Sequence, residues 1–187
     1  SLAENEKVLI VSAWWPEQRA LHALVHGENQ VDKGDCPIEV QDAENEWLKQ
    51  WRNGLPASQF EFFCVGVGAV VAAAKLSLYL ERSRNKFSKL IFIGTAGVYE
   101  KKFPLLSVSL GGALPVQKVV ASDGCLARGQ SYFPTGISQI HKSKGEPEFL
   151  SAACVNTPSI TTDKSVADVL AEIGDVENLE LYGCATA

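Results

Sequence analysis

The sequence predicts an α/β fold in which a mainly parallel central sheet is flanked by helices on both faces. Short apolar runs rich in β-branched residues alternate along the chain with amphipathic helical patterns. Two of these runs end in glycine turns, and hydrophobic residues make up 46% and charged residues 21% of the 187 residues, as in ordinary globular domains. In sheets of this kind, ligands bind at the carboxyl ends of the strands.

The apolar runs predict strands at residues 7–13, 60–67, 89–93, 116–121 and 152–156. The helical patterns predict helices at residues 17–25, 70–80 and 164–173, with a last helix that starts at residue 179. Residues 36–51 match neither pattern, and the Gly-, Ser-, Pro- and Lys-rich residues 124–148 are expected to form a loop that carries substrate contacts. We expect one domain over residues 3–187, whose C-terminal part is missing because the chain stops in the first turns of a helix.

Composition argues against several classes of partner. The net charge is -5 and no run of Lys or Arg is longer than a pair, so DNA and RNA are not expected ligands. The apolar stretches at 62–74 and 90–98 are too short and glycine-containing to span a membrane. The acidic N-terminus does not resemble a signal peptide. The five cysteines include no C-x-x-C pair and are expected to be reduced, as packing residues or bystanders. These features predict a cytoplasmic protein.

Glycine turns and acids near helix starts are the candidate functional residues. The turns at Gly66 to Gly68 and at Gly94 to Gly97 can bring backbone N–H groups close to a ligand. A dinucleotide fingerprint is not expected, because Val71 stands at the third glycine position. Glu17 and Glu180 each lie where a strand leads into a helix; either acid alone is explained by stabilisation of a helix N-terminus, but their convergence with the glycine turns indicates a site.

Histidine spacing does not predict a metal site. His22 and His26 are four residues apart but lack the Glu that directly follows the first His in the zinc motif. A pair on a helix surface is the expected arrangement, and neither a metal nor a cofactor is predicted.

Four segments, taken in order, resemble the nucleoside phosphorylase and nucleosidase superfamily, in particular its hydrolases for methylthioadenosine, S-adenosylhomocysteine and futalosine. The segments are KVLIVSAWWPEQRAL, CVGVGAVVAAA, LIFIGTAGVY and VENLELYGCATA. The resemblance implies that Glu17 orders the attacking water and that Glu180 binds the ribose hydroxyls. It implies a small-molecule nucleoside as ligand, a homodimer in which a neighbour closes the pocket, and no cofactor. The substrate contacts that it implies are Ala13, Gly68, Thr95, Ala96, Gly97 and Leu179.

The chain departs from the family pattern at several positions. Trp14, Trp15 and Pro16 replace acidic or small residues, where the indole rings would narrow the pocket or supply a stacking surface. Val98 stands where many members have a second glycine. The family's Asp that protonates the leaving base lies beyond the last helix, so no residue of this sequence is assigned that role.

Three functions other than nucleoside hydrolysis stay open at this point. The first is phosphorolysis of a nucleoside, but family phosphorylases have an Arg where this chain has Phe92, which favours hydrolysis. A nucleoside-binding relative without turnover and a Rossmann-type domain that binds NAD are the other two. The substrate is also open, because the E-N-x-E spacing favours futalosine whereas the other motifs fit thioadenosines equally well.

Overall fold

A computed structural model of the protein describes residues 6–26, 57–84, 86–106, 112–143 and 151–187. Within it, the chain divides into two compact units. The first contains the described residues of Ser1–Val65 and Tyr79–Gly94, and the second contains those of Gly66–Leu78 and Thr95–Ala187. Cys36, the unassigned residues 36–51 and the end of the expected loop at 144–148 lie outside the described ranges.

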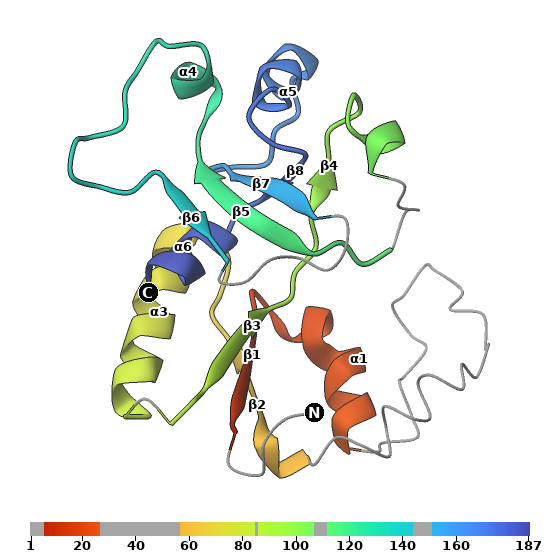
Figure 1. The fold of residues 1–187 in the computed structure, drawn as a ribbon, viewed down its shortest axis with the longest axis vertical. Helices are drawn as coiled ribbons and strands as arrows, with labels where there is room; N and C mark the ends of the chain where they lie inside the picture. Colours follow the sequence, from red (N-terminus) through yellow and green to blue (C-terminus); the bar gives the residue numbers. More distant parts are fainter. Residues whose placement is uncertain (1–5, 27–56, 85, 107–111, 144–150) are drawn as a thin grey trace. The chain divides into compact units, whose positions relative to one another are not determined.

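The first unit contains a parallel sheet of three strands in the order β2-β1-β3 (Figure 1). The strands are β1 (Val8–Ser12), β2 (Phe60–Cys64) and β3 (Lys89–Phe92). All of β1 is buried, because it lies between two neighbours and its residues VLIVS are almost entirely apolar. Helix α1 (Trp15–His26) follows β1 and has Pro16 in its first turn, where the missing N–H of proline costs no hydrogen bond. A short 3-10 helix, η2 (Ala57–Gln59), precedes β2.

The second unit contains a sheet of five strands in the order β4-β8-β7-β5-β6 (Figure 1). The three central strands are parallel, and the two edge strands pair antiparallel to them. The strands are β4 (Gly97–Val98), β5 (Val116–Ala121), β6 (Ile140–Lys142), β7 (Ala152–Asn156) and β8 (Val176–Asn178). The helices are α3 (Ala69–Arg82, whose last turn belongs to the first unit), η3 (Phe103–Leu105), α4 (Gly124–Ala127), α5 (Lys164–Leu170) and α6 (Leu181–Thr186).

Apolar side chains cover both faces of this second sheet. Neighbouring residues of β7 point to opposite faces, so Cys154 packs with Leu106, Val119 and Val176, whereas Val155 packs in a separate cluster. The second cluster contains Tyr99, Val155, Leu170 and Ala171. The predicted α/β class, with mainly parallel strands and helices on both faces, is therefore confirmed.

The differences from the sequence-based expectations have local causes. Strand β8 was not predicted, because its three residues include the polar Glu177 and Asn178, and β4 and β6 are equally short edge strands. Helix α5 ends at Leu170 and not at residue 173, because the N–H groups of Glu172 and Ile173 bond to carbonyls three residues earlier, those of Val169 and Leu170, and do not continue the α-helical pattern. The prediction of one domain over residues 3–187 stays a prediction. Within the described ranges, no helix is long and apolar enough to cross a membrane.

Gly183 provides a test of how closely α6 packs on the start of α3. A Cβ at position 183 would lie 2.8 Å from Ala69 Cα and closer still to the Ala69 carbonyl oxygen. Helix propensity alone predicts that Gly183→Ala stabilises the protein by about 1 kcal/mol. We expect the overpacking to dominate and to lower the free energy of unfolding in urea by about 2 kcal/mol. Gly97→Ala is the control, because no atom lies within 4 Å of a Cβ there; a stabilised Gly183→Ala variant would contradict the packing described.

Candidate functional site

Glu180 is a buried carboxylate at the point where β8 leads into α6. Its residue is only 5% exposed, and it caps α6 without using its side chain for a cap hydrogen bond. Oε1 of Glu180 instead accepts a hydrogen bond from Gly68 N at 2.9 Å, across 112 residues of sequence. Among the described residues, no donor reaches the second oxygen, Oε2. Since a buried carboxylate is stabilised by hydrogen bonds, Oε2 is a ready acceptor for a ligand hydroxyl.

The glycine turn that reaches Glu180 has the backbone conformation that its sequence predicts. Gly66 and Gly68 have φ values of 87° and 90°, in the left-handed region that favours glycine. Gly68 O then accepts from Ala72 N at 2.9 Å, which starts α3, while Gly68 N–H faces Glu180. The turn therefore delivers one backbone donor to the carboxylate and leaves the helix start intact.

Two buried asparagines surround the Glu180 turn. Oδ1 of Asn178 accepts from Glu180 N at 2.9 Å and from Leu181 N at 2.8 Å, and its Nδ2 donates to Thr95 O at 3.0 Å. Oδ1 of Asn156 accepts from Tyr182 N at 2.8 Å, and its Nδ2 donates to Leu179 O at 3.1 Å. These amides connect the ends of β7 and β8 to α6 and to the segment that begins at Thr95. Asn178 is the asparagine of the E-N-x-E segment, although it was assigned no role from the sequence, and Asn156 lies outside the four motif segments; the position of Asn156 directly before a turn was its available signal.

Thr95, Ala96 and Gly97 form an exposed segment whose backbone is fixed at both ends. Thr95 O is held by Asn178, and Gly97 begins β4, where it pairs with Glu177. The predicted contact residues Gly68, Thr95 and Leu179 therefore all lie within a hydrogen bond of Glu180 or of the asparagines that hold its turn. Ala96 and Gly97 continue the Thr95 segment.

Glu177, the other acid of the E-N-L-E segment, makes its hydrogen bonds on the face of β8 opposite to that of Asn178. Its Oε2 accepts from the hydroxyl of Tyr99 at 3.0 Å, and its Oε1 accepts from Thr161 N at 2.9 Å. Burial, together with the negative charge of Glu177, raises the pKa of the Tyr99 phenol well above its ordinary value. Because both oxygens of Glu177 already have donors, Glu180 is the better ligand-binding acid of the two.

Glu17 lies in the first turn of α1, in the first unit. Its Oε2 accepts from Ala13 N at 3.0 Å and from Trp14 N at 3.4 Å. This reach back to the N–H groups before a helix is half of a capping box, so the contact has a sufficient structural explanation. Ala13, a predicted contact residue, is buried, and its N–H helps to hold this carboxylate. The carboxylate lies at the carboxyl end of β1, where ligands of parallel sheets bind.

The two tryptophans before Glu17 differ in their surroundings. Trp15 packs edge-on against His22, with ring centroids 4.9 Å apart, and His22 also contacts Phe62 and His26. The histidines are thus part of an aromatic cluster on α1 and β2. Trp14 is 57% exposed and directly adjoins the Glu17 carboxylate, so its indole ring is available for stacking.

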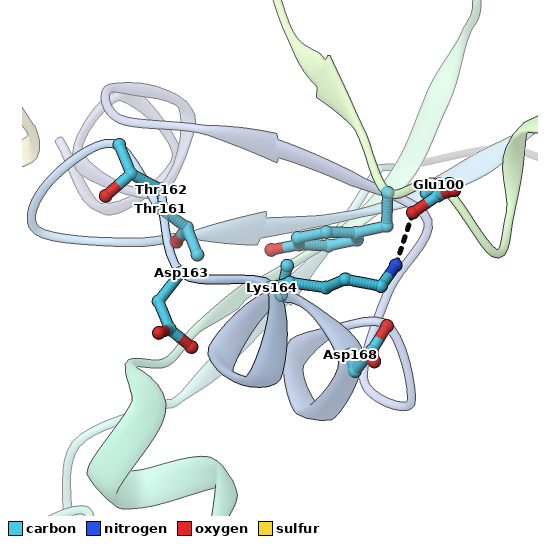
Figure 2. Close-up of a pocket in the computed structure, with 8 residues that line it drawn as sticks. Glu100, Thr161, Thr162, Asp163, Lys164 and Asp168 are labelled. Atoms are coloured by element: carbon cyan, nitrogen blue, oxygen red, sulfur yellow. Dashed lines mark hydrogen bonds and ion pairs between the residues drawn. The ribbon is translucent and has the colours of Figure 1, made fainter.

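A separate shallow pocket of about 210 Å³ lies beside α5, on the side of β8 that Glu177 faces. Figure 2 shows Lys164 extending toward Glu100, with which it forms an ion pair. Lys101 pairs in the same way with Asp168. These ion pairs offset the charges of Glu100, Lys164 and Asp168, and Oδ1 of Asp163 accepts hydrogen bonds from Ser165 Oγ and Val166 N. The pocket is lined by Tyr99, Glu100, Thr161, Thr162, Asp163, Lys164, Ala167 and Asp168.

Two buried thiols adjoin the Glu180 turn. Burial, and secondarily the negative charge of Glu180, raises the pKa of Cys184 to about 12. Burial also raises the pKa of Cys154 to about 12, outweighing a backbone hydrogen bond to Asn178 that lowers it. Both thiols are therefore neutral near pH 7 and act as small apolar side chains. In the parts of the chain that the structure describes, no three His, Cys, Asp or Glu side chains are grouped to hold a metal ion.

No protein-family model and no characterised protein sequence matches this chain. Solved structures match it in fold. One is the 5′-methylthioadenosine/S-adenosylhomocysteine nucleosidase of Helicobacter pylori, complexed with a pyrrolidin-3-ol that carries a 4-amino-5H-pyrrolo[3,2-d]pyrimidin-7-yl group; its TM-score is 0.63 at 12% identity, over 97% of this chain and 78% of that chain. A mutant of futalosine hydrolase from Helicobacter pylori strain 26695 matches with a TM-score of 0.59 at 13% identity, over 96% of this chain and 81% of that chain.

A third match is the corresponding nucleosidase of Campylobacter jejuni, with a TM-score of 0.59 at 14% identity, over 96% of this chain and 78% of that chain. The chain therefore has the fold of these nucleosidases, and the resemblance inferred from the four sequence segments is confirmed at the level of the fold. Identities this low carry the fold and not the substrate.

Because the pKa of the Cys184 thiol is raised in the folded protein, we expect the protein to lose stability at alkaline pH. Its pKa is 9.0 ordinarily and about 12 in the folded protein, so the unfolded chain releases this proton first. Below pH 9 the thiol is protonated in both states, so the free energy of unfolding is unaffected. As the pH rises above 9, ionisation of the unfolded chain lowers the free energy of unfolding, by about 1.4 kcal/mol at pH 10. We expect wild type to lose about 1 kcal/mol more than Cys184→Ala between pH 8 and pH 10 in urea unfolding. Cys125→Ala, at an exposed thiol, should follow wild type; equal losses in all three proteins would refute the buried state of Cys184.

Proposed function

We propose that this protein hydrolyses the N-glycosidic bond of a purine-type nucleoside of the methylthioadenosine, S-adenosylhomocysteine or futalosine class. The observation that carries the proposal is the state of Glu180. A buried carboxylate is fixed through Oε1 by Gly68 N–H, and its Oε2 receives no donor from the described residues; it lies beside the Thr95 segment on a fold shared with nucleosidases. Such a group suits a neutral ligand that presents hydroxyls, as ribose does.

The proposed role of Glu180 is to accept hydrogen bonds from the ribose hydroxyls. As the bond to the base breaks, its electron pair leaves with the base, which takes a proton from solvent. The ribose takes on positive, oxocarbenium-like charge, and its hydroxyls become stronger donors. A fixed carboxylate then binds the transition state more tightly than the ground state, which lowers the barrier. Gly68 N–H keeps Oε1 in place while this charge develops.

Glu17 is proposed to order and deprotonate the attacking water. Support comes from the resemblance of KVLIVSAWWPEQRAL to the family's first strand and turn, and from the position of Glu17 after β1. The N–H groups of Ala13 and Trp14 fix the position of Oε2, and a general base must be positioned before it can act. The contacts proposed for the nucleoside are Ala13, Gly68, Thr95, Ala96, Gly97 and Leu179. The homodimer implied by the resemblance and the cytoplasmic location predicted from the sequence features stay predictions.

Phosphorolysis is the second candidate, and one observation favours it. Lys75 Nζ would lie 3.4 Å from a Cβ at Gly66, so a cation is present beside the glycine turn. Against it, Phe92, a half-buried apolar residue at the end of β3, occupies the position at which family phosphorylases have an Arg. A single exposed lysine offers less to phosphate than the bidentate fork of an arginine, and we therefore favour water as the nucleophile.

Charge removal at the two acids tests the proposed roles. We expect Glu180→Gln to lower kcat by about 100- to 1000-fold, because an amide cannot supply the charge that the ribose hydroxyls require. Glu17→Gln should lower kcat by about 100- to 10,000-fold through loss of the base. Base release from methylthioadenosine, S-adenosylhomocysteine and futalosine is the measurement, and Glu172→Gln, at an exposed acid after α5, is the matched control. Wild-type rates in both active-site variants would refute the assignment, and nucleoside binding without base release would indicate a non-catalytic relative.

Dependence on phosphate separates the two reactions. We expect wild type to release base at the same rate with and without inorganic phosphate, and to produce the free sugar. Lys75→Ala should retain this rate, since the hydrolytic reading gives Lys75 no role. A rate that saturates with phosphate, yields a sugar 1-phosphate and falls in Lys75→Ala would establish phosphorolysis instead.

A further inference from the structure

Asn156 and Asn178 form a matched pair at the ends of two neighbouring strands. They are the last residues of β7 and β8, and they stand opposite each other in the parallel register. Both are buried, at 5% and 7% exposure. Buried amides are rare unless their donors and acceptors are used, so the pair requires a specific explanation.

Each of the two amides both donates and accepts where the chain turns toward α6. Their oxygens accept from three successive backbone N–H groups, those of Glu180, Leu181 and Tyr182. Their Nδ2 groups donate to the carbonyls of Leu179 and Thr95. An aspartate would lack the donor, and a serine hydroxyl is too short to make both contacts.

Asn178 differs from Asn156 because its two ends contact two different proposed binding segments. One end holds the backbone of Glu180 directly, and the other end holds the carbonyl of Thr95, 83 residues away in sequence. The amide therefore sets the distance between the Glu180 turn and the exposed Thr95 segment. Gly68 N–H fixes the Glu180 side chain from a third segment.

We infer that Asn178 is a positioning residue, which aligns the Glu180 carboxylate with the Thr95 segment for the ribose, and that Asn156 supports the same turn from β7. The inference rests on the proposed function for its catalytic consequence. The position in which Glu180 accepts the hydrogen bond from Gly68 N–H depends on Asn178 whatever the reaction is. Asn178 does not touch the reacting atoms in this account; it acts through Glu180.

Two substitutions at position 178 separate alignment from stability. Asn178→Ser keeps an oxygen that can accept from the first amides of α6 but removes the donor to Thr95 O. Asn178→Ala removes both functions and is expected to melt at a lower temperature than Asn178→Ser. Asp163→Ala is the matched control, because Oδ1 of Asp163 accepts from Val166 N at 3.0 Å as a cap of α5, so its loss costs a comparable cap without touching Glu180.

The measurements are kcat and KM for base release, the melting temperature, and amide hydrogen exchange at Gly68. Below the melting temperature, we expect Asn178→Ser to lower kcat by about 100-fold, as misplacement of a catalytic group does, with a smaller change in KM. Gly68 exchange should accelerate in Asn178→Ala and in Glu180→Ala, and it should match wild type in Asp163→Ala.

The outcomes distinguish this inference from the proposed function. If wild type releases no base from any nucleoside, the proposed function fails, and Gly68 exchange still decides the positioning role. If Gly68 exchange in Asn178→Ala equals that of wild type, the positioning role is overturned, whatever the activity. If Asn178→Ser retains the wild-type kcat and its melting temperature falls only as far as that of Asp163→Ala, Asn178 is only a structural cap.

Discussion

The second unit depends on how buried polar groups are satisfied where β7 and β8 end. Both strands end at a buried asparagine, and the first N–H groups of α6, which follows β8, have no partner within the helix. Asn156 and Asn178 supply the missing donors and acceptors, and they do so from the same level of the sheet. Without them, the turn that carries Glu180 would bury unpaired backbone groups, at about 1–3 kcal/mol for each group. The position of Glu180 is thus a consequence of the hydrogen bonds that the backbone around it requires.

The predictable part of the fold is the part that apolar patterning encodes. Buried strands such as β1 and β7 consist almost wholly of apolar residues, and α3 buries Ala72 and Leu76, which lie four residues apart on one face of the helix. Strand β8 was missed because Glu177 and Asn178 are polar for reasons of hydrogen bonding that a sequence does not reveal. Gly66 and Gly68 were predicted as a turn, and their positive φ values confirm why glycine is needed.

The two candidate acids differ in how much a sequence can say of them. The contacts of Glu17 with Ala13 and Trp14 lie within four residues, so a local motif predicts them and also explains them without any function. The contact of Glu180 with Gly68 links residues 112 apart, and no local helix requirement accounts for it. A buried acid whose partner comes from a distant glycine turn is therefore stronger evidence for a ligand site than a capping acid.

The surroundings of Glu180 also bear on what it can bind. Its neighbours include the neutral thiols of Cys154 and Cys184 and two neutral amides, and the charge of Glu180 contributes to keeping both thiols protonated. The amides at the start of α6 are occupied by asparagine oxygens, so they are not free for an anion such as phosphate. A low-polarity setting strengthens whatever hydrogen bond Oε2 accepts. The local chemistry therefore favours a neutral donor such as a sugar hydroxyl, whose bond to Glu180 would strengthen as positive charge develops on the ring.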